Sequence, residues 1–395
     1  MVCLLQDASP ADLLSAAVSA DAVVLDLTAS DREADLTALL GLLKDHNFDS
    51  AAESSSAAAP RSSPLVVLGL STVLTWNATQ KSSKKSSKES NWKLRKSSPR
   101  YKATRALESI LLSVARENAI VSMVVAAGVL YGNGEMDFHH LFKESWMHAG
   151  ESASNSSSSA SYEGLPLLGD GKNLIPTLHV FDLVSMMRLL LEGPPAEQTY
   201  FLAVDQGHTS QKALVTAISS GIGDGRIKQV DKMDEKVLLA ASNLAAGERA
   251  EDNTNAAASS SATAGAAAPA SAPAVAATPA QAAAAAASAA ALSSAVAVAN
   301  SLTNGNPEVM CADMKLEAEW LMSQPFEWHC EQGPAASPEV FETIRLEFVK
   351  ARNLKPVRIM VTGGPGAGTN RCTKRTQPGL ATSSRKPCAV PRFVL

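Results

Sequence analysis

The chain has 395 residues and a formal net charge of −4, with 46% hydrophobic and 19% charged residues. This length allows two domains and a linker, and the slightly acidic balance argues against a general nucleic-acid-binding protein. The sequence contains no apolar run of about 18 residues, so no membrane-spanning helix is expected. Its five cysteines are scattered without metal-ligand spacing, and the N-terminus does not resemble a secretory signal, so we expect a cytoplasmic protein.

Short apolar segments alternate with amphipathic segments between residues 1 and 245. The residue patterns predict strands over 22–27, 64–72, 120–126 and 200–204, and helices over 36–44, 105–117, 179–191 and 211–220. Alternation of strands with helices is typical of parallel βαβ units. The sequence therefore predicts an α/β domain over 1–245 with a partial Rossmann-like, doubly wound parallel sheet.

Low-complexity segments interrupt this pattern. Residues 81–100 contain eight lysines or arginines against Glu89 alone, residues 151–161 are rich in serine, and residues 246–306 are mostly alanine and serine. Such compositions bury too little apolar surface to offset the entropy of ordering, so we predict two disordered inserts and a disordered linker. We interpret the basic insert as a solvated loop; the alternative is a contact for an acidic partner such as a tubulin tail, or for nucleic acid.

A helical connector is predicted over 307–356, with helices over 312–322 and 338–352. Ser337 can cap the second helix, Pro338 suits its first position, and Phe341, Ile344 and Phe348 share one face. His139 and His140 lack a carboxylate or cysteine at ligand spacing, so no metal site is predicted.

A predicted strand over 357–361 runs into a glycine-rich turn. A turn of this kind lets backbone N–H groups surround a nucleotide phosphate. The P-loop pattern requires lysine and then serine or threonine after the last glycine, but Thr369 and Asn370 occupy these positions. The sequence predicts a degenerate ATP phosphate loop; a plain glycine turn or a dinucleotide-binding turn are the alternatives. The loop residues are Gly363, Gly364, Pro365, Gly366, Ala367 and Gly368.

Three segments carry a family resemblance: YGNGE at 131–135, LGDGKN at 168–173 and PTLHVFDL at 176–183. They resemble extended short-chain reductases of the nucleotide-sugar epimerase and dehydratase class. Together with NLKPVRI at 353–359 and the glycine turn, they resemble ciliary adenylate kinases of the isoform-seven type. In that family a reductase-like domain precedes a nucleoside monophosphate kinase domain. The resemblance covers about residues 22–238 and 308–368, apart from the inserts.

This resemblance implies phosphoryl transfer from ATP to AMP with magnesium. It also implies a nucleotide ligand, ciliary or axonemal protein partners, and a location in the cytoplasm or cilium, without a membrane or a specific nucleic acid. In the reductase class the start of the HVFDL helix borders the ligand cleft. His179 and Asp182 could therefore face a ligand, or they could cap and pack the helix. Tyr131 and Glu135 are expected to shape the turn after a strand.

The chain departs from the reductase pattern. No GxxGxxG turn lies near the N-terminus, and Tyr101 is followed four residues later by Arg105 instead of lysine. Ser71 and Tyr101 are the remaining reductase-like candidates, and we expect no NAD(P) binding. The chain could still be an NAD(P)-dependent epimerase or reductase, or a non-catalytic ciliary interaction module.

The last residues follow no family pattern. Residues 369–395 contain six lysines or arginines, no acid and no periodicity. They resemble out-of-frame or alternative-exon sequence, and we predict an unstructured tail. We therefore interpret 357–368 as the first strand and loop of an adenylate kinase-like domain and expect a catalytically incomplete chain.

Overall fold

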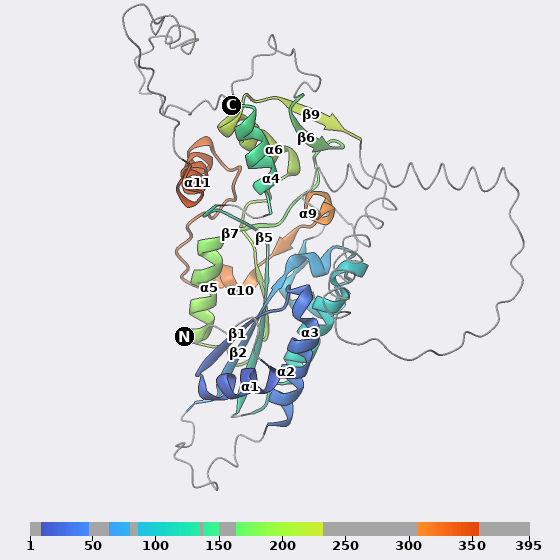
Figure 1. Ribbon diagram of the computed structural model, residues 1–395, viewed down its shortest axis with the longest axis vertical. Helices are drawn as coiled ribbons and strands as arrows, with labels where there is room; N and C mark the ends of the chain where they lie inside the picture. The colour runs from blue at the N-terminus through green and yellow to red at the C-terminus, as the bar shows by residue number, and fades with distance from the viewer. Residues whose placement is uncertain are drawn as a thin grey trace, which may run out of the picture.

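A parallel four-stranded sheet forms the centre of the fold. The computed structural model describes residues 9–46, 63–79, 86–117, 119–134, 137–149, 163–231 and 306–354 (Figure 1). The strands lie in the order β1 (Ala22–Asp26), β2 (Leu65–Thr72), β4 (Ile120–Ala127) and β8 (Tyr200–Ala203). This confirms the predicted Rossmann-like α/β class. The described strands follow chain order without a reversal, so they form one wing of a doubly wound sheet.

The central strands are apolar because helices and neighbouring segments cover both faces of the sheet. β2 pairs with β4 from Leu65 to Thr72, and nearly every residue of both strands is buried. α2 (Glu33–Asp45) buries leucines at helical spacing and packs between α1 (Pro10–Ser19) and α3 (Lys102–Ser113). In Figure 1, α3 lies to the right of the sheet and α5 (Val180–Glu192) to its left.

Further short elements extend the fold beyond the carboxyl ends of these strands. β5 (Val129–Tyr131) pairs with β7 (Thr177–His179), and β6 (Leu165–Leu168) pairs with β9 (Ile227–Val230). The helices α4 (His139–Met147), α6 (Gln211–Ile222) and α11 (Pro338–Ala351) gather at the upper end of Figure 1. The Phe341 ring fits against Gly221, where an added Cβ would lie 2.4 Å from the ring.

The described part of the basic insert, residues 86–100, is ordered, and the prediction of a disordered loop is wrong there. It forms β3 (Ser87–Lys88) and the 3-10 helices η4 (Glu89–Leu94) and η5 (Pro99–Tyr101). Arg95 is only 2% exposed because its guanidinium pairs with the buried carboxylate of Glu108. The buried charge of Arg95 is therefore paired, as a buried charge in a folded segment must be.

Residues 306–354 form part of the same fold. They contain α9 (Pro307–Cys311), β10 (Leu316–Glu317), α10 (Glu319–Ser323) and α11. β10 pairs with β3, and the Glu89 carboxylate accepts the backbone N–H groups of Leu202 and Trp320. The continuous helix predicted over 312–322 is wrong, because this backbone pairs with other segments. The prediction for α11 is confirmed, including the Ser337 cap at 3.3 Å from the Val340 nitrogen.

Several predictions lie outside the described residues. These are the Ser-rich insert 151–161, the linker 246–305, the strand 357–361, the glycine loop Gly363–Gly368 and the tail 369–395, which all stay predictions. None of the helices within the described ranges is long and apolar enough to cross a membrane.

Replacing Glu108 with alanine tests the buried ion pair. The change leaves the Arg95 guanidinium buried without its carboxylate, so we expect a loss of about 3–5 kcal/mol in the free energy of unfolding, measured in urea. Glu192→Ala breaks the exposed Arg188–Glu192 pair and serves as the control, with little expected effect. A Glu108→Ala loss no larger than that of the control would contradict this account.

Candidate functional site

Ligands of open parallel sheets ordinarily bind beyond the carboxyl ends of the strands, and β4 and β8 end on this side of the described sheet. Here the chain itself covers this position. The Gln206 N–H donates to the Glu331 carbonyl at 2.8 Å, and the Met314 N–H donates to the Leu174 carbonyl at 3.0 Å. A Cβ added at Gly207 would overlap the backbone of Gln332. Residues 306–354 therefore pack directly over the ends of the strands.

The HVFDL motif forms the junction between β7 and α5. His179 is the N-cap of α5, and its Nδ1 accepts the Phe181 N–H at 3.2 Å. The side chains of His179 and Asp182 are almost fully buried. The sequence left two possibilities for these residues, contact with a ligand or capping and packing of the helix. The structure shows which groups they contact.

Asp182 binds the backbone of the C-terminal segment. Its two carboxylate oxygens accept the N–H groups of His329, at 2.6 Å, and Cys330, at 3.0 Å. Charge-assisted hydrogen bonds of this kind are stronger than neutral ones. Asp182 therefore fixes the turn that precedes α11 against the start of α5.

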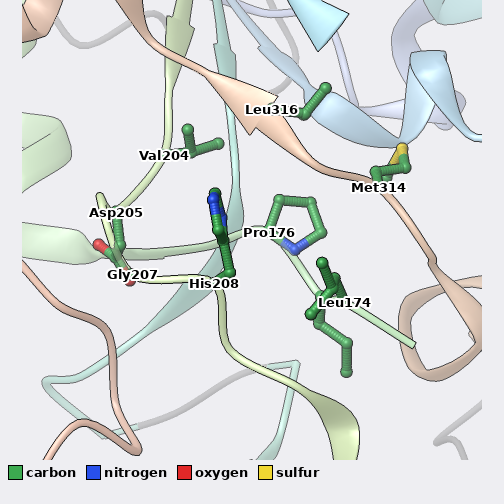
Figure 2. Close-up of a pocket in the computed structure, with 9 residues that line it drawn as sticks. Leu174, Pro176, Val204, Asp205, Gly207, His208, Met314 and Leu316 are labelled. Carbon is green, nitrogen blue, oxygen red and sulfur yellow. The ribbon is translucent and has the colours of Figure 1, made fainter. Parts of the chain in front are cut away.

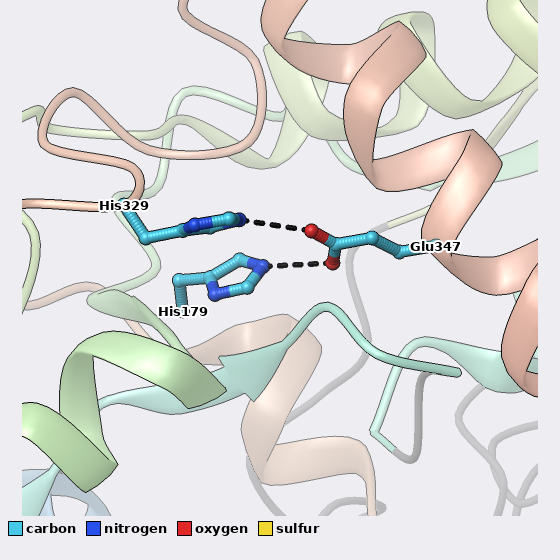
Figure 3. A group of neighbouring side chains, drawn as sticks. All are labelled: His179, His329 and Glu347. Carbon is cyan, nitrogen blue, oxygen red and sulfur yellow. Dashed lines mark hydrogen bonds and ion pairs between the residues drawn. The ribbon is translucent and has the colours of Figure 1, made fainter.

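His179 binds α11 through a second carboxylate. Figure 3 shows the His179 and His329 rings lying one above the other, both directed at Glu347. The His179 Nε2 lies 3.0 Å from one carboxylate oxygen of Glu347, and the His329 Nε2 lies 2.8 Å from the other. The Asn133 N–H, in the turn after β5, also donates to Glu347 at 3.0 Å. Glu347 thus connects α11 to three separate parts of the fold.

Two imidazoles and a carboxylate are also the donor types of a zinc site, and their ligand atoms all lie within 4.8 Å of one another. The tautomer of His179 does not fit this use. Its Nδ1 accepts the Phe181 N–H, so the ring proton of the neutral imidazole is on Nε2, which faces Glu347. A metal-bound histidine instead donates from its other nitrogen. The cluster is therefore a hydrogen-bonded anchor and does not fit a metal ion.

The two reductase-like candidates are bound to separate internal partners. The Ser71 hydroxyl donates to Glu108, which also pairs with Arg95. The Tyr101 hydroxyl accepts a hydrogen bond from the Asn306 side chain at 3.2 Å, and burial raises the pKa of Tyr101 to about 12. A phenol used in proton transfer near neutral pH would need the opposite shift. These contacts give Ser71 and Tyr101 structural roles.

Other sequence candidates also have structural surroundings. His139 and His140 lie on α4, and the His139 ring packs 6.0 Å from the ring of Phe348. Tyr131 ends β5 and its ring meets the His179 ring edge-on at 5.1 Å. Glu135 and the glycine loop lie outside the described residues.

A small cavity remains beside the covered strand ends (Figure 2). Its volume is about 10 Å³, room for about one water molecule, and it is lined mainly by apolar side chains together with Asp205 and His208. Asp205 accepts a hydrogen bond from Thr177 at 2.9 Å, and burial raises the pKa of its carboxyl well above the ordinary value. Ligand pockets usually span about 300–1,000 Å³, so this cavity is too small for a dinucleotide.

Sequence reasoning missed Glu347 and His329. Glu347 carried one signal, because it lies on the same side of α11 as the buried Ile344 and Phe348. His329 lies in a loop without a motif, so its approach to His179 could only be seen in three dimensions.

Asp182→Ala tests the anchor of the C-terminal segment. It leaves two backbone N–H groups without their acceptor, so we expect a loss of about 3 kcal/mol in the free energy of unfolding in urea. Asp170→Ala removes an exposed carboxylate that pairs with Lys172 and serves as the control. Equal stabilities of the two variants would show that Asp182 does not hold the segment.

The same anchor predicts a loss of stability in acid. Burial lowers the pKa of His179 below its ordinary value of 6.5. The unfolded chain therefore takes up a proton below about pH 6.5 that the folded chain does not, and stability is lost as the pH falls from there. Burial acts to raise the pKa of Glu347, but hydrogen bonds from Asn133 and His329 hold it below 4.5, which adds a further loss in stronger acid.

His179→Asn isolates this effect, because asparagine can cap α5 but has no ring to titrate. Urea unfolding between pH 8 and pH 5 should show that the native chain loses stability relative to this variant. A constant difference between the two proteins over that range would exclude the proposed proton linkage.

Comparison with known proteins points to one group of relatives. No family model matches the chain. It is 30% identical over 172 residues to adenylate kinase 7 of Mus musculus, covering 42% of this chain and 26% of the relative. It is 32% identical over 126 residues to adenylate kinase 7 of Macaca fascicularis, covering 32% and 21%. The chain thus spans about a quarter or less of the length of these relatives.

Solved structures also match part of the chain. A dTDP-glucose 4,6-dehydratase from Bacillus anthracis is 17% identical with a TM-score of 0.40, covering 57% of this chain and 67% of that one. A UDP-N-acetylglucosamine 4-epimerase from Bacillus cereus is 15% identical with a TM-score of 0.40, covering 60% and 78%. Over the residues matched by these relatives, the chain is similar to adenylate kinase 7.

Proposed function

We propose that the described α/β fold is a non-catalytic docking module of an adenylate kinase 7-like protein. Its role is to hold residues 306–354, the segment that leads to the glycine loop at Gly363–Gly368. The observation that carries this proposal is the use of His179 and Asp182. Both bind residues of the C-terminal segment, at the position where a reductase would bind its ligand.

The kinase reaction belongs to the complete family member in this proposal. Phosphoryl transfer from ATP to AMP depends on magnesium and on cationic groups that stabilise the transferring phosphoryl group. The glycine loop of this chain has Thr369 where the phosphate-binding lysine is required. Loss of such a group costs several kcal/mol of transition-state stabilisation, so this chain is catalytically incomplete. A cytoplasmic or ciliary location and axonemal partners are proposed from the family resemblance.

An NAD(P)-dependent epimerase or reductase is the weaker explanation. Such an enzyme requires a cofactor cleft and a serine and a tyrosine whose hydroxyls can reach the substrate. Here the Ser71 and Tyr101 hydroxyls each bind an internal partner. The described cavity beside Asp205 is also too small for a dinucleotide.

Nucleotide titrations separate these functions. We expect no NADPH binding by calorimetry, because the described cavity beside Asp205 is too small for a dinucleotide. We also expect no ADP formation from ATP, AMP and magnesium, because Thr369 stands where the phosphate-binding lysine is required. NADPH binding weakened by Ser71→Ala would favour a reductase. ADP formation abolished by Gly368→Val would show that the glycine loop is competent and would overturn the proposed inactivity.

A further inference from the structure

The ordered part of the basic insert has an inner face and an outer face of different character. The inner face carries Glu89 and Arg95, both 2% exposed and both bound to buried partners. The exposed residues of this segment include Lys93, Leu94 and Lys96, which lie close together in the sequence. We call these three residues the outer face of the insert.

The only acid of the insert does not neutralise this outer face. The Glu89 carboxylate points inward and accepts backbone N–H groups of Leu202 and Trp320. Lys88 already pairs with Glu319 at 2.8 Å. Within the described ranges, neither Lys93 nor Lys96 has a carboxylate at ion-pair distance. The chain as a whole is acidic, so this positive surface is a local feature.

Leu94 lies between the two lysines in the sequence, and 74% of its surface is exposed, the largest value among the exposed large hydrophobic residues of the described ranges. A single exposed leucine is ordinary, but this one is held in place. The Arg95 N–H donates to the Trp92 carbonyl, and the Lys96 N–H donates to the Thr79 hydroxyl at 2.8 Å. A surface that is already ordered loses little entropy when a partner binds.

The contacts of Trp92, the aromatic residue next to Lys93, favour a peptide over nucleic acid as the partner. The Trp92 ring stacks on Tyr200 at 5.1 Å with an interplanar angle of 7°, and Arg95 and Lys93 lie over its ring system. Binding of single-stranded nucleic acid depends on exposed aromatic rings that stack on bases. Trp92 is occupied by internal contacts and does not offer such a platform.

We propose that the outer face of the insert binds an acidic peptide segment with an apolar side chain. The carboxylates pair with Lys93 and Lys96, and the apolar side chain contacts Leu94. Complementary charge gives such a complex its specificity and its dependence on salt.

Fluorescence anisotropy with a labelled glutamate-rich peptide containing one leucine tests this proposal. The native chain should bind the peptide at low salt and release it at high salt. The Lys93→Glu/Lys96→Glu double variant should weaken binding by about tenfold or more, since attraction becomes repulsion. Leu94→Ser should weaken binding several-fold without changing the salt dependence, because it removes an apolar contact only.

Lys143→Glu/Lys212→Glu is the matched control, because it reverses two exposed charges on α4 and α6. Unchanged binding by this control supports the proposal. Equal weakening by both double variants would overturn it, because the net charge of the chain alone would then explain the binding. Absence of peptide binding by the native chain would overturn it. Tighter binding of a labelled single-stranded DNA than of the peptide would also overturn it. Since the exchanged side chains are exposed, thermal unfolding should confirm that every variant is folded.

Discussion

The hydrogen bonds of Asp182 are the contact on which the arrangement of this fold depends. A carboxylate buried at the start of α5 must find donors, because an unpaired buried charge is costly. It finds them in the backbone of His329 and Cys330, far along the chain. His179, three residues earlier, adds Glu347 of α11. These contacts bring the C-terminal segment over the ends of the strands.

A second set of buried charges lies in and around the basic insert. Glu89 connects β8 to α10, and the Arg95–Glu108 pair fixes the basic insert on α3. Burial raises the pKa of Glu108 while Arg95 opposes that shift, as expected for a carboxylate that depends on its partner. The domain thus uses polar residues from its inserts and motifs for internal connection, which agrees with a docking role better than with catalysis.

The sequence predicted the elements that are recognisable from neighbouring residues, and it did not predict contacts between residues far apart in the chain. β2 and β4 are continuous apolar runs, and α11 has helical periodicity and a capping serine, so their positions were predictable from neighbouring residues. The basic insert was predicted wrongly because composition averages over residues and does not reveal that Arg95 meets Glu108. The contact between His179 and Glu347 joins residues 168 positions apart. Pairing between residues so far apart in the sequence leaves no local signal. The position of Glu347 beside the buried face of α11 was only a partial signal.

Hydrogen exchange of the α11 amides in the native chain and in Asp182→Ala tests the central claim most directly. Loss of the anchor should expose α11 to faster exchange, while the amides of β2 and β4 keep their protection, because local opening follows the contacts that are removed. Unchanged protection of α11 in Asp182→Ala would contradict the claim that the HVFDL motif holds the C-terminal segment in place.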